Sequence, residues 1–128
     1  MSPKANKEPQ QETIDSLAAV QLAAKAASAK KAADMVALDL REVASFTEYF
    51  LLCTGGNARQ VQAISNSIEE ELRKAGKRPL HIEGYSTGEW ILLDYGDFIV
   101  HAFSTTARRF YDLERLWRDA GRVELKEE

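Results

Sequence analysis

Three helices are predicted by apolar residues that recur about every 3.6 positions along the chain. The clearest of them follows Asn57, a residue favoured at helix N-caps, and ends at Gly76, a residue favoured just past helix C-termini. Its apolar face consists of Val61, Ile64, Ile68 and Leu72. A helix with one apolar stripe is typical of an element that packs on a sheet or on another helix.

The other two helices are predicted near the ends of the chain. The earlier one is capped by Thr13 and continues to Lys31 through an alanine-rich run of high helix propensity. Its apolar positions are Ile14, Leu17, Ala18 and Leu22. The later one begins at Thr105 or Thr106 and ends at Gly121. Its apolar stripe consists of Phe110, Leu113, Leu116 and Trp117.

Five short apolar runs between these helices have the length of β-strands. They are residues 35–40, 49–54, 79–83, 90–94 and 98–103. Because side chains alternate along a strand, Trp90, Leu92 and Asp94 share one face of theirs. His101 likewise shares a face with Phe103. The order of the elements predicts a mixed five-stranded sheet faced by about three helices, of the α/β or α+β class.

The chain has 128 residues, of which 45% are hydrophobic and 29% are charged, and it fits a single globular domain. We assign residues 13–125 to this domain, residues 1–12 to a disordered N-terminal tail and residues 126–128 to a frayed C-terminus. The net charge is −3, although the last segment is rich in arginine. This balance argues against an affinity that depends mainly on nucleic-acid phosphates.

A minor contact with RNA is one interpretation of the last predicted helix. Arg108, Arg109 and Arg115 could bind phosphates while Tyr111 stacks on a base. The alternative is a solvated helical face, because nearby acids such as Asp112 dilute the positive potential.

Residue counts argue against metals, cofactors and disulfides. The single cysteine, Cys53, follows two leucines and is expected to be a buried thiol, and two histidines give no zinc-binding spacing. No run approaches the ~20 apolar residues of a membrane span, and the first eleven residues lack the apolar stretch of a signal peptide. We therefore expect a cytoplasmic protein with no metal, no cofactor and no membrane contact.

The motifs leave an enzyme open as the alternative. The Gly55-Gly56 pair lies between a strand and a helix, where glycines let backbone amides approach a phosphate. Asp94 and Asp97 flank another glycine turn and could hold a divalent cation. Both features are also ordinary turns, because the lysine of a phosphate-binding loop is missing after Gly56. The alternative function is a nucleotide-binding or nucleotidyltransferase enzyme.

Segment 81–117 has the composition of a recognition surface. It contains both tryptophans, three of the four tyrosines and both histidines of the chain. Tryptophan, tyrosine and arginine are enriched at the energetic centres of protein interfaces. His101 lies in the middle of a predicted strand with no nucleophile placed to use it, which favours a packing or interface role over a general base.

An ordered set of short motifs resembles the ribosomal silencing factor family, also called Iojap-like. The motifs are Asp39-Leu40, FTEYF at 46–50, ARQVQAISNSIEEEL at 58–72, Glu83-Gly84 before Gly88-Glu89-Trp90, DYGD at 94–97, VHAF at 100–103 and RRFYDLERLW at 108–117. The resemblance covers about residues 18–125. It implies a nucleotidyltransferase-like sheet that lacks nucleotidyltransfer activity, since function depends on the site and not on the fold.

The resemblance also implies a function in translation. A member of this family is expected to bind the large ribosomal subunit through ribosomal protein fourteen and to block joining with the small subunit when nutrients are limiting. A homodimer is expected as well, and no catalysis is required. The candidate contact residues carried by these motifs are Trp90, Asp94, Tyr95, His101, Arg108 and Tyr111.

Overall fold

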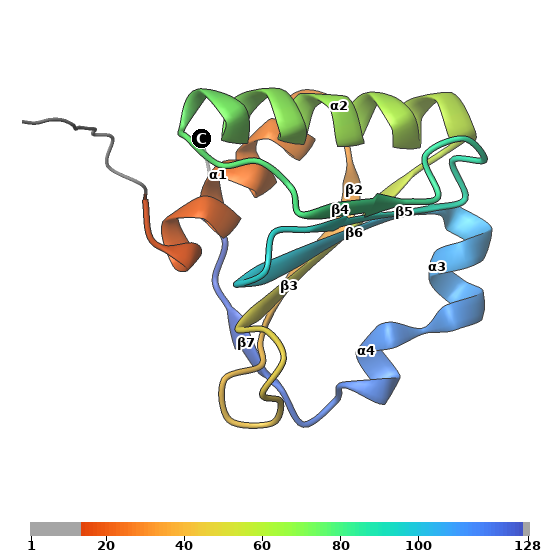
Figure 1. Cartoon of the computed structure of the whole chain (residues 1–128). Coiled ribbons are helices and arrows are strands. Elements are labelled where there is room, and N and C mark those ends of the chain that lie inside the picture. The colour runs from red at the N-terminus through yellow and green to blue at the C-terminus, as the bar shows by residue number, and fades with distance from the viewer. Residues whose placement is uncertain (1–13, 127–128) are drawn as a thin grey trace, which may run out of the picture.

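A mixed six-stranded sheet organises residues 14–126, which the computed structural model describes (Figure 1). The strands are β2 (Ala33–Asp39), β3 (Tyr49–Gly55), β4 (His81–Glu83), β5 (Trp90–Asp94), β6 (Phe98–Ser104) and β7 (Gly121–Val123). They lie side by side in the order β4-β5-β6-β3-β2-β7. The β3–β6 pair is parallel and the other neighbouring pairs are antiparallel. The predicted mixed α/β class is confirmed, and the predicted tail at 1–12 lies outside the described residues.

The sequence prediction of five strands was one too few, because β7 pairs with β2 at the edge of the sheet. A three-residue strand is too short to show an alternating pattern, so the sequence carried no signal for it. The chain beyond β7 is also held in place. Gln21 donates its side-chain amide to the carbonyl oxygen of Glu124 and accepts the backbone N–H of Lys126. Residues 127 and 128 of the predicted frayed end lie outside the described residues.

Helix α2 (Ala58–Lys74) covers one face of the sheet as predicted. The Asn57 side chain caps it by accepting the backbone N–H of Gln60 at 2.8 Å. Its four predicted apolar residues, Val61, Ile64, Ile68 and Leu72, are fully buried. Period and capping together were sufficient to place this helix, because its apolar stripe is continuous over about three turns.

Helix α1 (Ser16–Ala29) lies beside α2 on the same face, and the prediction of its apolar side was only partly right. Ile14 and Leu22 pack, partly buried, against the apolar cluster on this side of the sheet, whereas Leu17 and Ala18 are exposed. Leu17 is 41% exposed, and the buried residues are small ones: Ala19, Val20, Ala23, Ala24, Ala26 and Ala27. Small side chains let α1 approach α2 closely enough for Ser67 to donate its hydroxyl to the carbonyl oxygen of Ala26 at 2.9 Å. The cap is Asp15, which accepts the backbone N–H of Ala18. Thr13, the predicted cap, lies outside the described residues.

The C-terminal helix was predicted as one element and is two. Helix α3 (Thr105–Tyr111) ends at Asp112, which has left-handed backbone angles with φ of 48°, and α4 (Leu113–Leu116) follows in a new direction. The change of direction breaks the predicted stripe. Phe110 is 77% exposed and Leu116 is 72% exposed, whereas Leu113 and Trp117 pack against the sheet.

The sheet separates two apolar clusters. The larger cluster lies under α1 and α2 and includes Cys53, which is fully buried as the sequence predicted. The smaller one lies on the opposite side, where α3 and α4 are found (Figure 1). Among the described residues, no helix is long and apolar enough to cross a membrane.

Candidate protein-interaction surface

Aromatic side chains gather on the side of the sheet that α3 and α4 only partly cover. We call this surface the aromatic face; it consists of Phe46, Phe50, Trp90, His101, Phe103, Tyr111 and Trp117. Phe46 is 57% exposed and Tyr111 is 49% exposed, while Trp90 is half-buried. Strand alternation places Trp90 and His101 here as predicted, since Trp90 pairs with Phe103, and His101 with Leu92, on neighbouring strands.

A hydrogen bond between two aromatic side chains lies within this face. The Trp90 indole N–H donates to Nδ1 of His101 at 3.0 Å. Since Nδ1 accepts this hydrogen bond, the neutral ring carries its own proton on Nε2, which is buried and has no partner among the described residues. Burial lowers the pKa of His101 to about 3. His101 is therefore neutral at physiological pH and supports the indole of Trp90.

Ring contacts connect the aromatic face from one end to the other. Trp90 packs on Tyr111 of α3 with 4.5 Å between ring centroids and on Phe103 with 5.1 Å. His101 meets Phe50 edge to face at 4.5 Å, and Phe50 meets Trp117 at 5.8 Å. Such tilted and edge-to-face pairs are the favoured geometries for aromatic rings. The rings thus form one continuous layer across strands β5, β6 and β3.

The loop before β5 sets the position of Trp90. Gly84 has a φ of 80°, and a side chain there would meet the carbonyl oxygen of Trp90 at 2.0 Å, so only glycine fits. Gly88 has a φ of 68° and lies against Ala58 at the start of α2 with equally little room. The Glu89 carboxylate accepts the hydroxyl of Ser104 at 2.9 Å. The loop is held from both sides, and Trp90 emerges from it in a fixed place.

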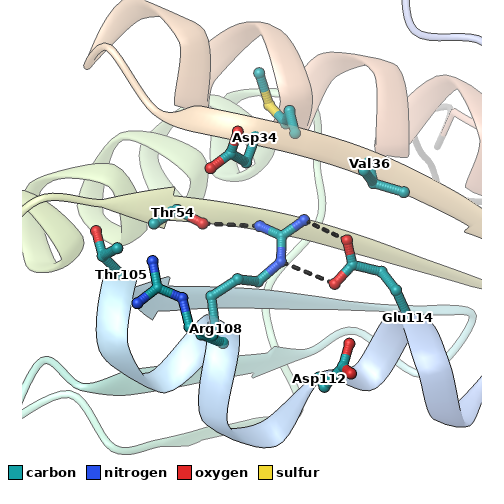
Figure 2. Close-up of a pocket in the computed structure, with 9 residues that line it drawn as sticks. Asp34, Val36, Thr54, Thr105, Arg108, Asp112 and Glu114 are labelled. Atoms are coloured by element: carbon teal, nitrogen blue, oxygen red, sulfur yellow. Dashed lines mark hydrogen bonds and ion pairs between the residues drawn. The ribbon is translucent and has the colours of Figure 1, made fainter.

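Arg108 holds α3 and α4 against the sheet, and we call this arrangement the clamp (Figure 2). Its guanidinium donates through Nη1 to the Thr54 hydroxyl at 2.8 Å. Nε and Nη2 donate to the two carboxylate oxygens of Glu114 at 3.0 and 2.9 Å. The Arg108 side chain is 11% exposed, and it lowers the pKa of Glu114. Bidentate pairing of this kind fixes both direction and distance.

The clamp lines a pocket of about 470 Å³ between β2, β3 and α3. Asp34 and Asp112 lie at its border, each with a left-handed backbone. Three of the five N–H donors of Arg108 form hydrogen bonds with Thr54 and Glu114. The pocket is therefore organised around an internal ion pair.

The six predicted contact residues do not form one surface. Trp90, His101 and Tyr111 lie together, and Asp94 is on the same side at the far end of β5, where its carboxylate accepts the backbone N–H of Gly96. Tyr95 packs instead into the cluster under α1 and α2. It stacks on the ring of Phe98, and burial raises the pKa of its hydroxyl. The sixth, Arg108, lies within the clamp.

The residues of the enzyme alternative do not meet. Gly55 pairs with Ser104 at one end of β6, and Asp97 comes just before Phe98 at the other end. Seven strand residues separate the two places by roughly 20 Å. Gly55 lies against Val61 of α2 with 3.0 Å left for a Cβ atom, which explains the glycine by packing. In residues 14–126 no group of three or more His, Cys, Asp or Glu side chains could hold a metal ion.

Four residues of the site were missed as functional candidates. Phe50 could have been found, since it shares an alternating face with Leu52 in a predicted strand. Phe46 lies in a connecting segment without periodicity, and Trp117 was assigned to a helix that in fact ends before it. The sequence alone predicts that Glu114 is a solvated acid, because its partner Arg108 is six residues away and not at helical spacing. The pair becomes visible only in the arrangement of α3 and α4.

Comparison with protein families gives one match over nearly the whole chain. The family model described as "Ribosomal silencing factor during starvation" matches residues 13–128. Ribosomal silencing factor RsfS of Halalkalibacterium halodurans is 39% identical over 107 residues, covering 84% of this chain and 92% of the relative. The protein of the same name from Bacillus subtilis is 38% identical, with 83% and 90% covered. A chloroplastic Iojap protein of Zea mays is 34% identical over 102 residues, covering 80% of this chain and 44% of the relative.

Two solved structures have the same fold. A crystal structure of a protein from Chromobacterium violaceum superposes with a TM-score of 0.80 at 33% identity, covering 87% of this chain and 91% of that protein. A crystal structure from Bacillus halodurans gives a TM-score of 0.76 at 37% identity, with 85% and 99% covered.

Proposed function

This chain belongs to the ribosomal silencing factor family, and we propose that it binds the large ribosomal subunit through ribosomal protein fourteen and blocks joining with the small subunit. The outcome is repression of translation when nutrients are limiting. The family match supports a role at the ribosome. The observation that carries the choice of surface is the aromatic face, where Trp90 is positioned by the bond to His101.

Trp90 and Tyr111 are the residues that we assign to direct contact. They pack on each other, both are partly exposed, and they combine large apolar area with a polar atom, as interface hot spots do. Asp94 extends the same side of the sheet and offers a carboxylate at its border. We place the centre of the interface at Trp90 and its rim at Asp94, where charge affects specificity more than affinity.

Three other candidates act from behind the surface. His101 supports the Trp90 indole, and Arg108 fixes α3, which carries Tyr111. Tyr95 contributes only to the packing under α1 and α2. Substitutions of these residues change binding through the position of their neighbours and are accompanied by a loss of stability.

The mechanism is steric and needs no chemical step. A domain that occupies the joining face of the large subunit excludes the small subunit by overlap, so inhibition equals the occupied fraction of free large subunits. We accordingly propose a protein that is not an enzyme, requires no cofactor and acts in the cytoplasm.

Cosedimentation with purified ribosomal subunits tests this proposal. The protein is expected to comigrate with isolated large subunits in a sucrose gradient and to bind much more weakly to joined ribosomes. It should also lower the light scattering that follows mixing of large and small subunits, because fewer subunits join. Isolated ribosomal protein fourteen should compete for it. Absence from the large-subunit peak at low salt, or equal binding to joined ribosomes, contradicts the proposal.

We also propose that the free protein self-associates through the aromatic face. Phe46 and Tyr111 are exposed on this face and Trp90 and Trp117 are partly exposed, and apolar area of this kind is costly to leave in water. If the two uses of the face compete, ribosomal protein fourteen should convert the dimer into a one-to-one complex. Light scattering of the free protein and of the mixture measures both masses, and a complex that retains two copies of this chain rules out the shared surface.

A further inference from the structure

The outer side of α3 and α4 presents arginines and apolar side chains around one open hollow of about 720 Å³. We call this surface the basic groove; it consists of Arg109, Phe110, Arg115, Leu116 and Arg118. Phe110 is 77% exposed and Leu116 is 72% exposed, so nothing in the described chain covers the groove. Tyr111 connects it to the aromatic face, because its ring contacts Phe110 at 4.9 Å and Trp90 at 4.5 Å.

The charges of the groove are not neutralised locally. The guanidinium groups of Arg109, Arg115 and Arg118 form no ion pair or hydrogen bond with the residues that the structure describes, in contrast to Arg108 in the clamp. The acids that line the same hollow are Asp112 and Asp119. Three arginines against two aspartates leave one positive charge, in a chain whose net charge is −3. The groove is therefore locally basic in a chain that is acidic overall.

We propose that the basic groove binds RNA of the large ribosomal subunit while the aromatic face binds the ribosomal protein; this inference rests on the proposed function. Arginine guanidinium groups bind phosphate oxygens bidentately. An exposed aromatic ring such as Phe110 stacks on an unpaired base regardless of sequence. The interleaving of arginines with an exposed ring matches an RNA strand, because each nucleotide offers a phosphate to an arginine and the face of a base to the ring.

The geometry makes the two contacts compatible. Tyr111 belongs to both surfaces, so a ribosomal protein seated on Trp90 leaves the groove facing whatever borders that protein. On a ribosomal subunit that border is largely RNA. The groove therefore adds affinity only when RNA is present. The chain should bind the assembled subunit more tightly than it binds the isolated ribosomal protein.

The test compares two triple variants with the unmodified chain. One is Arg109→Gln/Arg115→Gln/Arg118→Gln, which empties the groove of positive charge. The matched control is Arg59→Gln/Arg73→Gln/Arg78→Gln, which removes the same number of charges on and after α2, on the other side of the sheet. Affinity is measured for large subunits at several salt concentrations and for isolated ribosomal protein fourteen.

The groove variant should lose roughly tenfold or more in affinity for large subunits at low salt. Its slope of log affinity against log salt should be shallower by about 2, since each lost phosphate contact removes about 0.7 to 0.9. Affinity for the isolated ribosomal protein should not change, and the control variant should match the unmodified chain. Phe110→Ala should lower large-subunit affinity about fivefold or more without changing the salt slope.

Four outcomes overturn the inference in different ways. An unchanged salt slope in the groove variant shows that the arginines contact no phosphate. An equal loss on the isolated ribosomal protein assigns the groove to a protein contact. If the unmodified chain does not bind large subunits at all, the proposed function fails and the RNA contact falls with it. If the unmodified chain binds large subunits and the groove variant binds them equally well, the RNA contact is refuted and the proposed function stands.

Discussion

The two faces of the sheet bury side chains of different kinds. Under α1 and α2 the cluster is mostly aliphatic and small, and it includes Ile91 and Leu93 of β5 at 0% exposure. On the aromatic face the same strand contributes Trp90 and Leu92, which stay partly exposed. The difference lies in adjacent residues of one strand, because alternate side chains point to opposite faces.

This contrast assigns different tasks to the two faces. Aliphatic residues sealed between helices and sheet contribute stability through burial and close packing. Aromatic residues that remain half in water keep area available for a partner, and their polar atoms give the contact direction. Neighbours on β5 therefore test the separation directly, since one substitution should affect folding and the next should affect binding.

The largest expected effect on stability comes from Ile91→Ala. The side chain is fully buried between β5 and α2, and its removal leaves a cavity, so the free energy of unfolding should fall by ~3 kcal/mol. Urea denaturation followed by circular dichroism measures it. At a temperature where the variant is folded, its affinity for large subunits should equal that of the unmodified chain. A loss of affinity in the folded variant means that the faces are coupled.

The largest expected effect on binding comes from the preceding residue. Trp90→Ala should weaken binding to large subunits by ~2 kcal/mol or more, which is roughly thirtyfold in Kd, because an aromatic anchor at an interface centre is lost. Arg109→Ala should cost less, since a single exposed charge contributes ~1 kcal/mol or less. Trp90→Phe keeps one six-membered aromatic ring but loses the rest of the indole and the donor to His101, so its effect should fall between the two.

Tyr85→Ala is the matched control for this substitution. Tyr85 is an aromatic residue, 39% exposed, on the loop before β5 and outside the aromatic face. It should bind as well as the unmodified chain. Each variant must retain its circular dichroism spectrum, and a folded Trp90→Ala protein that still blocks subunit joining at the original concentration would remove Trp90 from the interface.

Much of the fold could be predicted because its main elements carry strong periodicity. The α2 helix and strand β5 were placed within a residue or two, and alternation correctly put Trp90 and His101 on one face. Helix α1 was placed, but its buried side was only partly right: Leu22 packs against the core as predicted and Leu17 does not, because the buried alanines add too little apolar character to a sequence pattern to show where the helix packs. Close packing against α2, and not the hydrophobicity of single residues, determines which side of α1 is buried.

The candidate site was predictable only where it lies on strands. The chain turns at Asp112 because this residue has a left-handed backbone conformation. Aspartate permits that conformation, but its presence in a sequence does not predict it. Without that break Arg108 reads as an exposed contact residue and Glu114 as a solvated acid. Their bidentate pair, and the support of α3 that it gives, depends on two short helices meeting at an angle.

A pH-dependent loss of stability should come from the aromatic face. Burial lowers the pKa of His101 to about 3, whereas the unfolded chain takes up this proton near pH 6.5. The stabilising contribution is present above pH 6.5 and is lost as the pH falls toward 3, because the unfolded state then binds one more proton. We expect a loss of ~2 kcal/mol between pH 7 and pH 5.

His101→Gln isolates this effect. Glutamine can still accept the Trp90 N–H through its side-chain oxygen, but it does not titrate. The variant should be less stable at pH 7 and should change little between pH 7 and pH 5 in urea denaturation. A slope as steep as that of the unmodified chain would assign the pH dependence to another group.

The smallest expected effect tests whether the clamp supports the aromatic face. Glu114→Gln keeps one acceptor for Arg108 and removes the charge, so the free energy of unfolding should fall by ~1 kcal/mol at pH 7. Because Arg108 lowers the pKa of Glu114, the contribution is present above the ordinary carboxyl range near 4.5 and disappears as the pH falls below it. The variant should therefore equal the unmodified chain in stability in strong acid.

The affinity of Glu114→Gln for large subunits should fall severalfold, since α3 carries Tyr111 against Trp90. Glu70→Gln, which loses an exposed pair with Arg73 on α2, should change neither quantity measurably. If Glu114→Gln loses stability while its affinity stays intact, the clamp stabilises the C-terminal helices without positioning the interface.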